Sequence, residues 1–172
     1  MVKRSLLAIA AGVMGGLVLS ACTETTTETL QSAARESTSV TAENPDAVLP
    51  PANKLAKDTQ EAATHDRSRS KLAYVGVWAA SADGCKLIDQ TVYNSFAVIT
   101  PTSVRQFEES CTYTPPPLTS NVHQLDVTCT AEGETASRVI VIEIINGQTI
   151  RFQNSALSGK SWEMYRCHLP SN

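Results

Sequence analysis

The chemistry available to this chain lies first in its cysteines. The 172-residue sequence contains five, at positions 22, 85, 111, 129 and 167. The last four are an even number, which favours two disulfide bonds if the protein is exported to an oxidising compartment. Zinc is the competing interpretation, with His123 or His168 as a further ligand. We favour disulfides, because the sequence has neither Cys-x-x-Cys nor His-x-x-x-His spacing.

Residue types found in catalytic motifs are present, but their spacing completes no motif. Gly159-Lys160-Ser161 matches only the end of a phosphate-binding loop, since Asn154 stands where that loop needs a glycine. Glu108 and Glu109 would point to opposite faces of a strand, so they cannot act together. For His123, at the surface or a loop edge, neither a nucleophile nor an orienting carboxylate can be assigned. We therefore expect no enzyme activity, no cofactor and no metal.

Cys22 follows the most apolar stretch of the chain. Lys3 and Arg4 form a short cationic head, and Leu6 to Leu19 is uncharged. This stretch falls short of the roughly 20 apolar residues that a helix needs to cross a bilayer, which suits a cleaved signal peptide. Leu19-Ser20-Ala21-Cys22 resembles the lipobox of bacterial lipoproteins.

The lipoprotein resemblance implies an anchored protein. In that family the signal, here residues 1–21, is cut before the cysteine, whose thiol receives a diacylglycerol and whose amino group is usually acylated, for example with palmitate. Each buried methylene contributes about 0.8 kcal/mol, so two or three chains on Cys22 would anchor the protein permanently. Thr23 is not the aspartate of inner-membrane retention, which favours the outer membrane, facing the periplasm. A plain secreted protein with a chance cysteine is the alternative.

Composition divides the mature chain into a linker and a domain. Residues 23–71 have no Phe, Trp or Tyr and are rich in Thr, Ser and Glu. Such a segment buries too little apolar surface to offset its ordering entropy, so we expect residues 22–71 to be a disordered linker with at most a short helix at 54–64. Loss of residues 1–21 removes two positive charges and no acid, so the net charge changes from −3 to −5. That acidic excess argues against nucleic-acid binding.

Residues 72–169 are expected to form one all-β domain, followed by a tail at 170–172. Asn146-Gly147 between two β-branched runs is typical of a two-residue hairpin turn. The number of hairpins favours a small antiparallel barrel or sandwich. Short apolar or alternating stretches predict about eight strands, at 72–79, 85–88, 96–100, 104–113, 125–130, 139–145, 148–152 and 162–167.

The run at 139–145 is apolar on both faces, which indicates a central strand or an intermolecular surface. Glu143 interrupts it and would have a raised pKa if it were buried without a partner. Arg138 and Arg151 are the nearest basic residues along the chain, and pairing with one of them is the commoner outcome.

The predicted strand order also predicts how the cysteines pair. If strands alternate in direction, Cys85 opens the second and Cys129 ends the fifth, which places both at one end of the barrel. Cys111 and Cys167 then fall at the other end. We therefore expect bonds between Cys85 and Cys129 and between Cys111 and Cys167.

Gly76-Val77-Trp78 is similar to the Gly-x-Trp motif of calycin-type barrels, whose tryptophan plugs one end of the barrel against an arginine of the last strand. The resemblance implies Trp78 as plug and Arg166 as its cation–π partner. It also points to two inhibitor families, namely periplasmic metalloprotease inhibitors with calycin-like barrels and membrane-bound lysozyme inhibitors. Ser158-Gly159-Lys160-Ser161 is similar in composition to the loop that the second family uses.

Binding is the function that these patterns favour. We expect a non-enzymatic envelope lipoprotein whose tethered β domain binds or organises a protein, peptidoglycan or a lipid. The alternative is a periplasmic inhibitor of a protease or lysozyme. A hollow barrel would instead favour carriage of a small ligand.

Mass spectrometry of the mature protein checks the modification of Cys22. We expect a chain that begins at Cys22 and carries a diacylglycerol and an N-acyl group. A chain that retains residues 1–21, or one without acyl groups, would contradict the lipoprotein interpretation and the compartment inferred from it.

Overall fold

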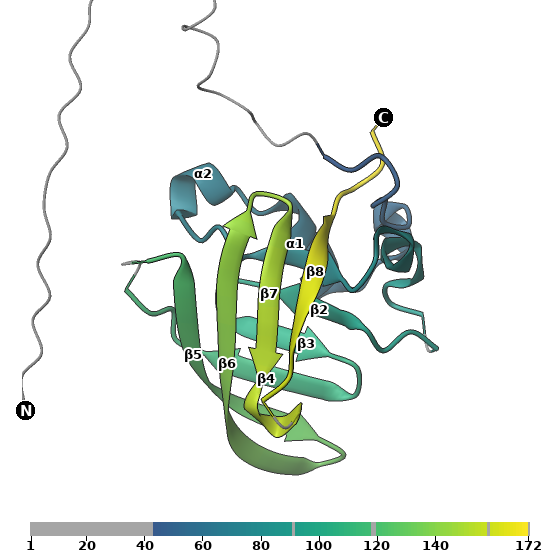
Figure 1. The fold of residues 1–172 in the computed structure, drawn as a ribbon. Helices are drawn as coiled ribbons and strands as arrows, with labels where there is room; N and C mark the ends of the chain where they lie inside the picture. The colour runs from purple at the N-terminus through teal and green to yellow at the C-terminus, as the bar shows by residue number, and fades with distance from the viewer. Residues whose placement is uncertain (1–42, 91, 118–119, 158, 172) are drawn as a thin grey trace, which may run out of the picture. The chain divides into compact units, whose positions relative to one another are not determined.

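The computed structural model describes residues 43–171, apart from residues 91, 118–119 and 158. A closed antiparallel barrel of eight strands forms its centre, and each strand is hydrogen-bonded to its neighbours in the sequence (Figure 1). The last strand pairs with the first and closes the barrel. The predicted all-β fold is confirmed, in its barrel form.

The elements follow the chain in a simple order. The strands are β1 (Gly76–Ala79), β2 (Phe96–Ile99), β3 (Ser103–Gln106), β4 (Glu109–Tyr113), β5 (Val122–Ala131), β6 (Glu134–Asn146), β7 (Thr149–Asn154) and β8 (Ser161–Cys167). The helices are the 3₁₀ turns η1 (Ala52–Lys54), η2 (Ala82–Leu87) and η3 (Ser155–Leu157), with α1 (Lys57–Thr64) and α2 (Arg67–Ser70).

Side chains fill the barrel. Along β5 every second residue is buried, because alternate residues of a strand point to opposite faces. The inward residues of the other strands meet them in one continuous core, so the interior is packed and offers no support for carriage of a small ligand. Its main members are Trp78, Ile99, Val104, Cys111, Leu125, Ile140, Ile142, Ile150 and Phe152.

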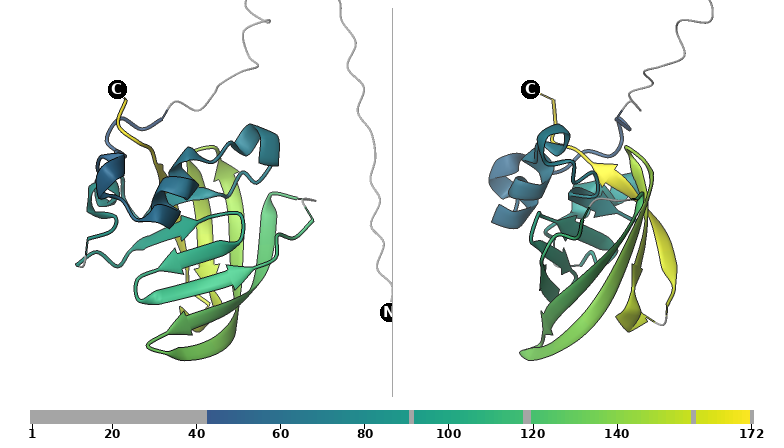
Figure 2. Two further views of the ribbon diagram at one scale, coloured as in Figure 1. Left: turned by 180° about the vertical axis from the view of Figure 1, so that it is seen from behind. Right: turned by 90° about the vertical axis from the view of Figure 1, so that its left-hand side faces the viewer.

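β1 and β2 are buried on both faces. Their outward side chains, among them Val77 and Val98, pack against Leu49, Leu55 and Ala62 of the segment that precedes the barrel. Figure 2 shows the helices of that segment against this side of the barrel.

The N-terminal boundary of the folded part therefore differs from our prediction. A disordered linker is wrong for residues 43–71, because their few apolar side chains are spaced to cover β1 and β2. A parallel bridge between Val48 and His168 adds backbone hydrogen bonds, with Leu49 N donating to His168 O at 2.8 Å and His168 N to Ala47 O at 3.0 Å. The predictions for residues 1–42 lie outside the described residues.

The number of strands agrees with the prediction because two errors cancel. The predicted strand at 85–88 lies mostly in η2, whose first turn is capped by the Ser81 hydroxyl accepting from Gly84 N. The predicted strand at 104–113 is the hairpin of β3 and β4, with a turn at Phe107 and Glu108. Glu108 takes a φ of 57° there, which alternation of side chains does not reveal.

The hairpins also differ in their turn residues. Between β5 and β6 the turn is Glu132-Gly133, and both residues have positive φ, at 51° and 86°. The hairpin predicted at Asn146-Gly147 is present, but Asn146 ends β6 and a register shift precedes it, so Gly147 and Gln148 connect the strands.

The two disulfides are present, but their predicted pairing is wrong. Cys85 bonds to Cys167, and Cys111 bonds to Cys129. Cys85 lies in η2 rather than in a second strand, so the alternation of strand ends did not apply to it. Cys111 and Cys129 lie directly opposite each other on β4 and β5 and face the core.

We expect the two disulfides to stabilise the protein unequally. Chain entropy gives about 4.5 kcal/mol for the Cys85–Cys167 bond and about 3 kcal/mol for the Cys111–Cys129 bond, since they close loops of 82 and 18 residues. Urea unfolding of the two double cysteine-to-alanine variants measures the difference. All four cysteines are buried, so the variants are matched in packing. A larger loss from removal of Cys111–Cys129 would contradict this order.

Candidate binding site

Arg166 and Trp78 close one end of the barrel. The guanidinium carbon of Arg166 lies 3.9 Å from the centre of the Trp78 indole. Arg166 also donates to three carbonyl oxygens, those of Ala73 (2.7 Å), Val75 (2.9 Å) and Gly147 (2.8 Å). These bonds tie β8 to the chain that enters β1 and to the β6–β7 turn.

Gly76 belongs to the same plug. A Cβ atom at this position would lie 2.2 Å from a terminal nitrogen of Arg166, so only glycine lets the guanidinium reach the backbone. Burial lowers the pKa of Arg166 to about 9, which leaves the guanidinium charged at neutral pH. This end of the barrel is a structural closure.

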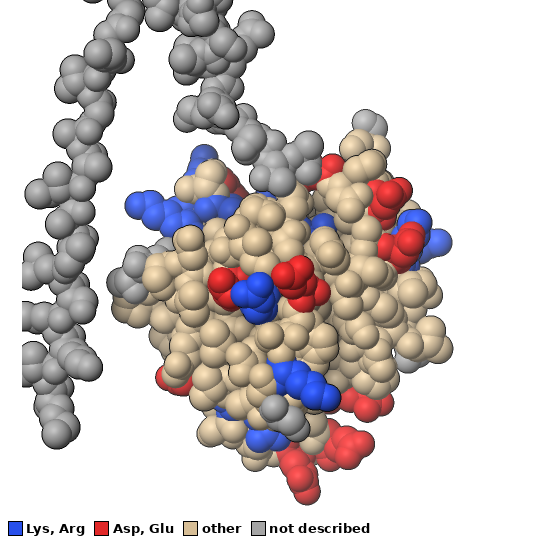
Figure 3. All heavy atoms as spheres, in the orientation of Figure 1, with Lys and Arg blue, Asp and Glu red and all other residues tan. Residues whose placement is uncertain are grey.

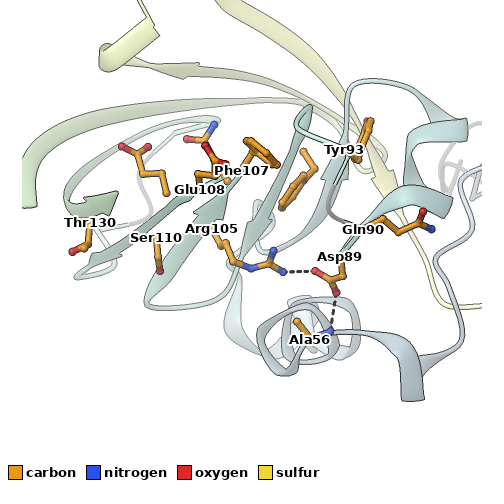
Figure 4. Close-up of a pocket in the computed structure, with 12 residues that line it drawn as sticks. Ala56, Asp89, Gln90, Tyr93, Arg105, Phe107, Glu108, Ser110 and Thr130 are labelled. Atoms are coloured by element: carbon orange, nitrogen blue, oxygen red, sulfur yellow. Dashed lines mark hydrogen bonds and ion pairs between the residues drawn. The ribbon is translucent and has the colours of Figure 1, made fainter. Parts of the chain in front are cut away.

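A groove of about 420 Å³ opens beside the β3–β4 hairpin, between that hairpin, the start of α1 and the loop after η2 (Figure 4). We call it the groove. The side chains that define it are Asp89, Tyr93, Phe96, Arg105, Phe107 and Glu108.

Arg105 forms the centre of the groove wall. It donates to Asp58 and to Asp89 (2.6 Å) and to the Thr59 hydroxyl (2.7 Å), and it lies 5.3 Å from the Phe96 ring. Burial alone would lower the pKa of Arg105, but hydrogen bonds to the two carboxylates raise it overall. Its charge is therefore satisfied within the protein, where it fastens α1 to the barrel.

The opposite wall of the groove is acidic. Glu109 lies 3.8 Å from Arg138 and accepts from Asn154 at 3.1 Å. Glu108 makes no ion pair among the described residues. The β5–β6 hairpin adds two further acids, Glu132 and Glu134, to an adjoining depression. We call these four glutamates and Arg138 the acidic rim, because it carries more negative than positive charge.

A second, smaller opening shares two lining residues, Phe96 and Gln106, with the groove. We call it the cleft. It lies between the start of β2 and β8, at the end of the barrel where η3 lies. Its walls are mainly apolar, with Phe152, Leu157, Trp162 and Met164, and its volume is about 120 Å³.

The chemistry of the groove and cleft suits recognition. Asp89 and Glu109 already hold Arg105 and Arg138. Thr59 is hydrogen-bonded to Asp89, but it is fully buried and out of reach of a substrate. What stays exposed is aromatic, amide and acidic surface.

Comparisons with protein-family models, curated proteins and solved structures found no match. The described helices include none long and apolar enough to cross a membrane.

Several residues considered from sequence lie away from the groove. Glu143 is half-exposed and pairs with Arg151, one of the two partners considered for it. Gly159 and Lys160 are exposed in the loop before β8. Disulfide bonding leaves the sulfurs of the four domain cysteines unable to ligate zinc. Cys22 lies outside the described residues.

We expected His123 at the surface or a loop edge, but it is buried. It is 5% exposed, faces the core from β5 and contacts the Tyr74 ring at 4.8 Å between centroids. Its position in phase with Leu125 and Val127 gives the reason, since alternate residues of one strand share a face.

We expect His123 and His168 to change the free energy of unfolding with pH in opposite directions. Burial lowers the pKa of His123 below 6.5, so its contribution is present above pH 6.5 and lost as the pH falls through the lowered pKa. Burial acts the same way on His168, but hydrogen bonds with Asn44 and Leu169 raise its pKa above 6.5 overall. Its contribution is present below pH 6.5 and lost as the pH rises through the raised pKa.

We expect His123→Phe to reduce the loss of unfolding free energy between about pH 7 and about pH 5, and His168→Asn to enlarge it. Urea unfolding across this range measures both. Variants that shift the pH dependence in the same direction would contradict the assignment.

Proposed function

We propose that this chain is a non-enzymatic lipoprotein, anchored through Cys22 to the outer membrane on its periplasmic side, whose barrel binds an envelope partner: a protein, peptidoglycan or a lipid. The lipobox supports the anchor. Two disulfides in one small domain support an oxidising compartment.

The observation that carries the proposal is an apolar outer face on a barrel that is already packed inside. On the outer side of the β5–β8 sheet Val122 is 52% exposed, Ile145 41% and Tyr165 38%. Val139 and Val141 lie on the same side of β6, beyond the row of Glu143, and are half-buried. Apolar groups gathered on one face commonly mark an interaction site.

Few charges interrupt this face. Figure 3 shows it largely free of charged residues around one acidic, basic and acidic cluster. Arg151 holds that cluster together by contacting Glu143 and Glu163. A partner that covered the face would bury few unpaired charges, which lowers the desolvation cost of binding.

Inhibition of a protease or lysozyme is the second candidate. It is favoured by the exposed Gly159 and Lys160 in the loop before β8, because Leu157 and Trp162, on either side of that loop in sequence, line the cleft. An inhibitor and an organising protein differ in what happens to the captured partner, so one experiment separates them.

Site-specific photocrosslinking in intact envelopes tests the proposal. We expect a benzoylphenylalanine at Val122 or Tyr165 to crosslink the same partner, and one at exposed Lys57 on α1 to serve as the unreactive control. The partner's hydrolytic activity, if it has one, should be unchanged by the purified lipoprotein. A hydrolase whose activity falls would identify an inhibitor, and anchored protein that crosslinks nothing at either position would contradict the proposal.

A further inference from the structure

The N-terminal part of β8 has a strand neighbour on one side only. β8 pairs with β7 from Ser161 to Tyr165, whereas it pairs with β1 only from Tyr165 to Cys167. β1 ends at Ala79, and the chain then leaves the barrel towards η2. Within the described chain, Ser161–Met164 therefore forms a short free edge on the β1 side of β8.

The hydrogen bonding of β8 shows which groups face that edge. Arg166 N donates to Gln148 O at 2.9 Å, so the backbone of Arg166 points towards β7. Alternate residues of an antiparallel strand direct their N–H and C=O groups to opposite neighbours. The N–H and C=O groups of Ser161 and Glu163 consequently point away from β7, and no backbone bond occupies them among the described residues.

The cleft lies directly beside this edge. Met164 pairs with Ile150 and belongs to the core, and Trp162, two residues earlier on the same side of the strand, lines the cleft. Ser161 and Glu163 lie on the opposite, outer side. Pockets for whole small ligands usually have about 300 to 1,000 Å³. The cleft has about 120 Å³, which suits one apolar side chain.

An occupant must therefore bond to the free backbone groups of β8 and fit one apolar side chain into the cleft. The charge around the cleft adds a further requirement. Gln106 lines both the cleft and the groove, and Glu108, two residues further along the chain, lines the groove. A segment that left the cleft in this direction would be favoured by a basic side chain. Residues 23–42 of this chain carry three glutamates and one arginine, so they are poorly suited to the site.

We propose that an extended peptide segment of a partner protein adds to the free edge of β8 as a further antiparallel strand. Its backbone bonds to Ser161 and Glu163, one apolar side chain enters the cleft beside Trp162, and a lysine or arginine reaches Glu108. This inference rests on the proposed binding function, but it concerns a different surface from the outer face of β5–β8. Strand addition gives affinity through the backbone and specificity through the side-chain pocket.

The test selects displayed random peptides of about seven residues, enough to span the free edge and its flanks, on the full mature lipoprotein in detergent. We expect enriched peptides to alternate, with one apolar residue and at least one lysine or arginine. Binding can be followed directly by fluorescence. The chain has two tryptophans; Trp78 is fully buried and Trp162 is 38% exposed, so a blue shift on binding reports the cleft.

Ser161→Pro and Ser161→Ala form the decisive pair. Proline removes the N–H that faces the free edge and leaves the bonds to β7 intact, while alanine keeps the N–H. We expect about tenfold weaker binding for Ser161→Pro and unchanged binding for Ser161→Ala. Trp162→Leu lacks the reporting indole, so its binding is followed with a fluorescently labelled peptide; it should weaken binding by at least about tenfold. Glu108→Gln should weaken only basic peptides, with a smaller salt dependence.

The outcomes separate the two proposals. Equal binding by Ser161→Pro and Ser161→Ala would overturn strand addition. Failure to enrich any peptide would also overturn it, and crosslinking at Val122 or Tyr165 would then still support the proposed function. A Trp162 shift caused by peptidoglycan fragments, but by no peptide, would replace the inference with a glycan site. Unfolding curves of each variant show whether the barrel is intact.

Discussion

Burial of β1 and β2 on both faces is the constraint on which this structure depends. Their inner side chains complete the barrel core, and their outer side chains form a second core with residues 43–71. A barrel of this size has a modest core, so a second layer adds apolar burial that the strands alone cannot provide. Arg105 fixes that layer in register by joining β3 to Asp58 and Asp89. The groove exists because this layer stands beside the β3–β4 hairpin.

Much of the barrel could be predicted from the sequence because side-chain alternation is a local property. β5 and β7 alternate regularly, and their predicted positions were close. The errors arose where local backbone chemistry overrides alternation, as at Ser81, which caps η2, and at Glu108, which turns a predicted strand into a hairpin. The ordered segment at 43–71 was missed because composition measures how many apolar residues a segment has. It does not show that a few of them can be buried against an apolar face elsewhere in the chain.

The candidate site was less predictable for a physical reason. Trp78 and Arg166 could be paired because a motif places both at strand positions. Arg105, Asp58 and Asp89 are separated in sequence, and no local pattern joins them. His123 and Asn154 carried a usable signal, since each is in phase with buried residues of its strand. The cleft arises from the early end of β1, a boundary that sequence patterns fix poorly.

The order of strands gives the two disulfides different positions in folding. Every strand pairs with its neighbour in sequence, so the hairpins can form from local contacts. Among the strand and bridge pairings of the described residues, only β1–β8 and the Val48–His168 bridge join distant parts of the chain. Cys111 and Cys129 meet within one hairpin. Cys85 and Cys167 meet only when the barrel has closed around its circumference. Formation of the Cys85–Cys167 bond therefore marks the completion of the fold. A chain that has only the Cys111–Cys129 bond is one in which β1 and β8 have not yet paired.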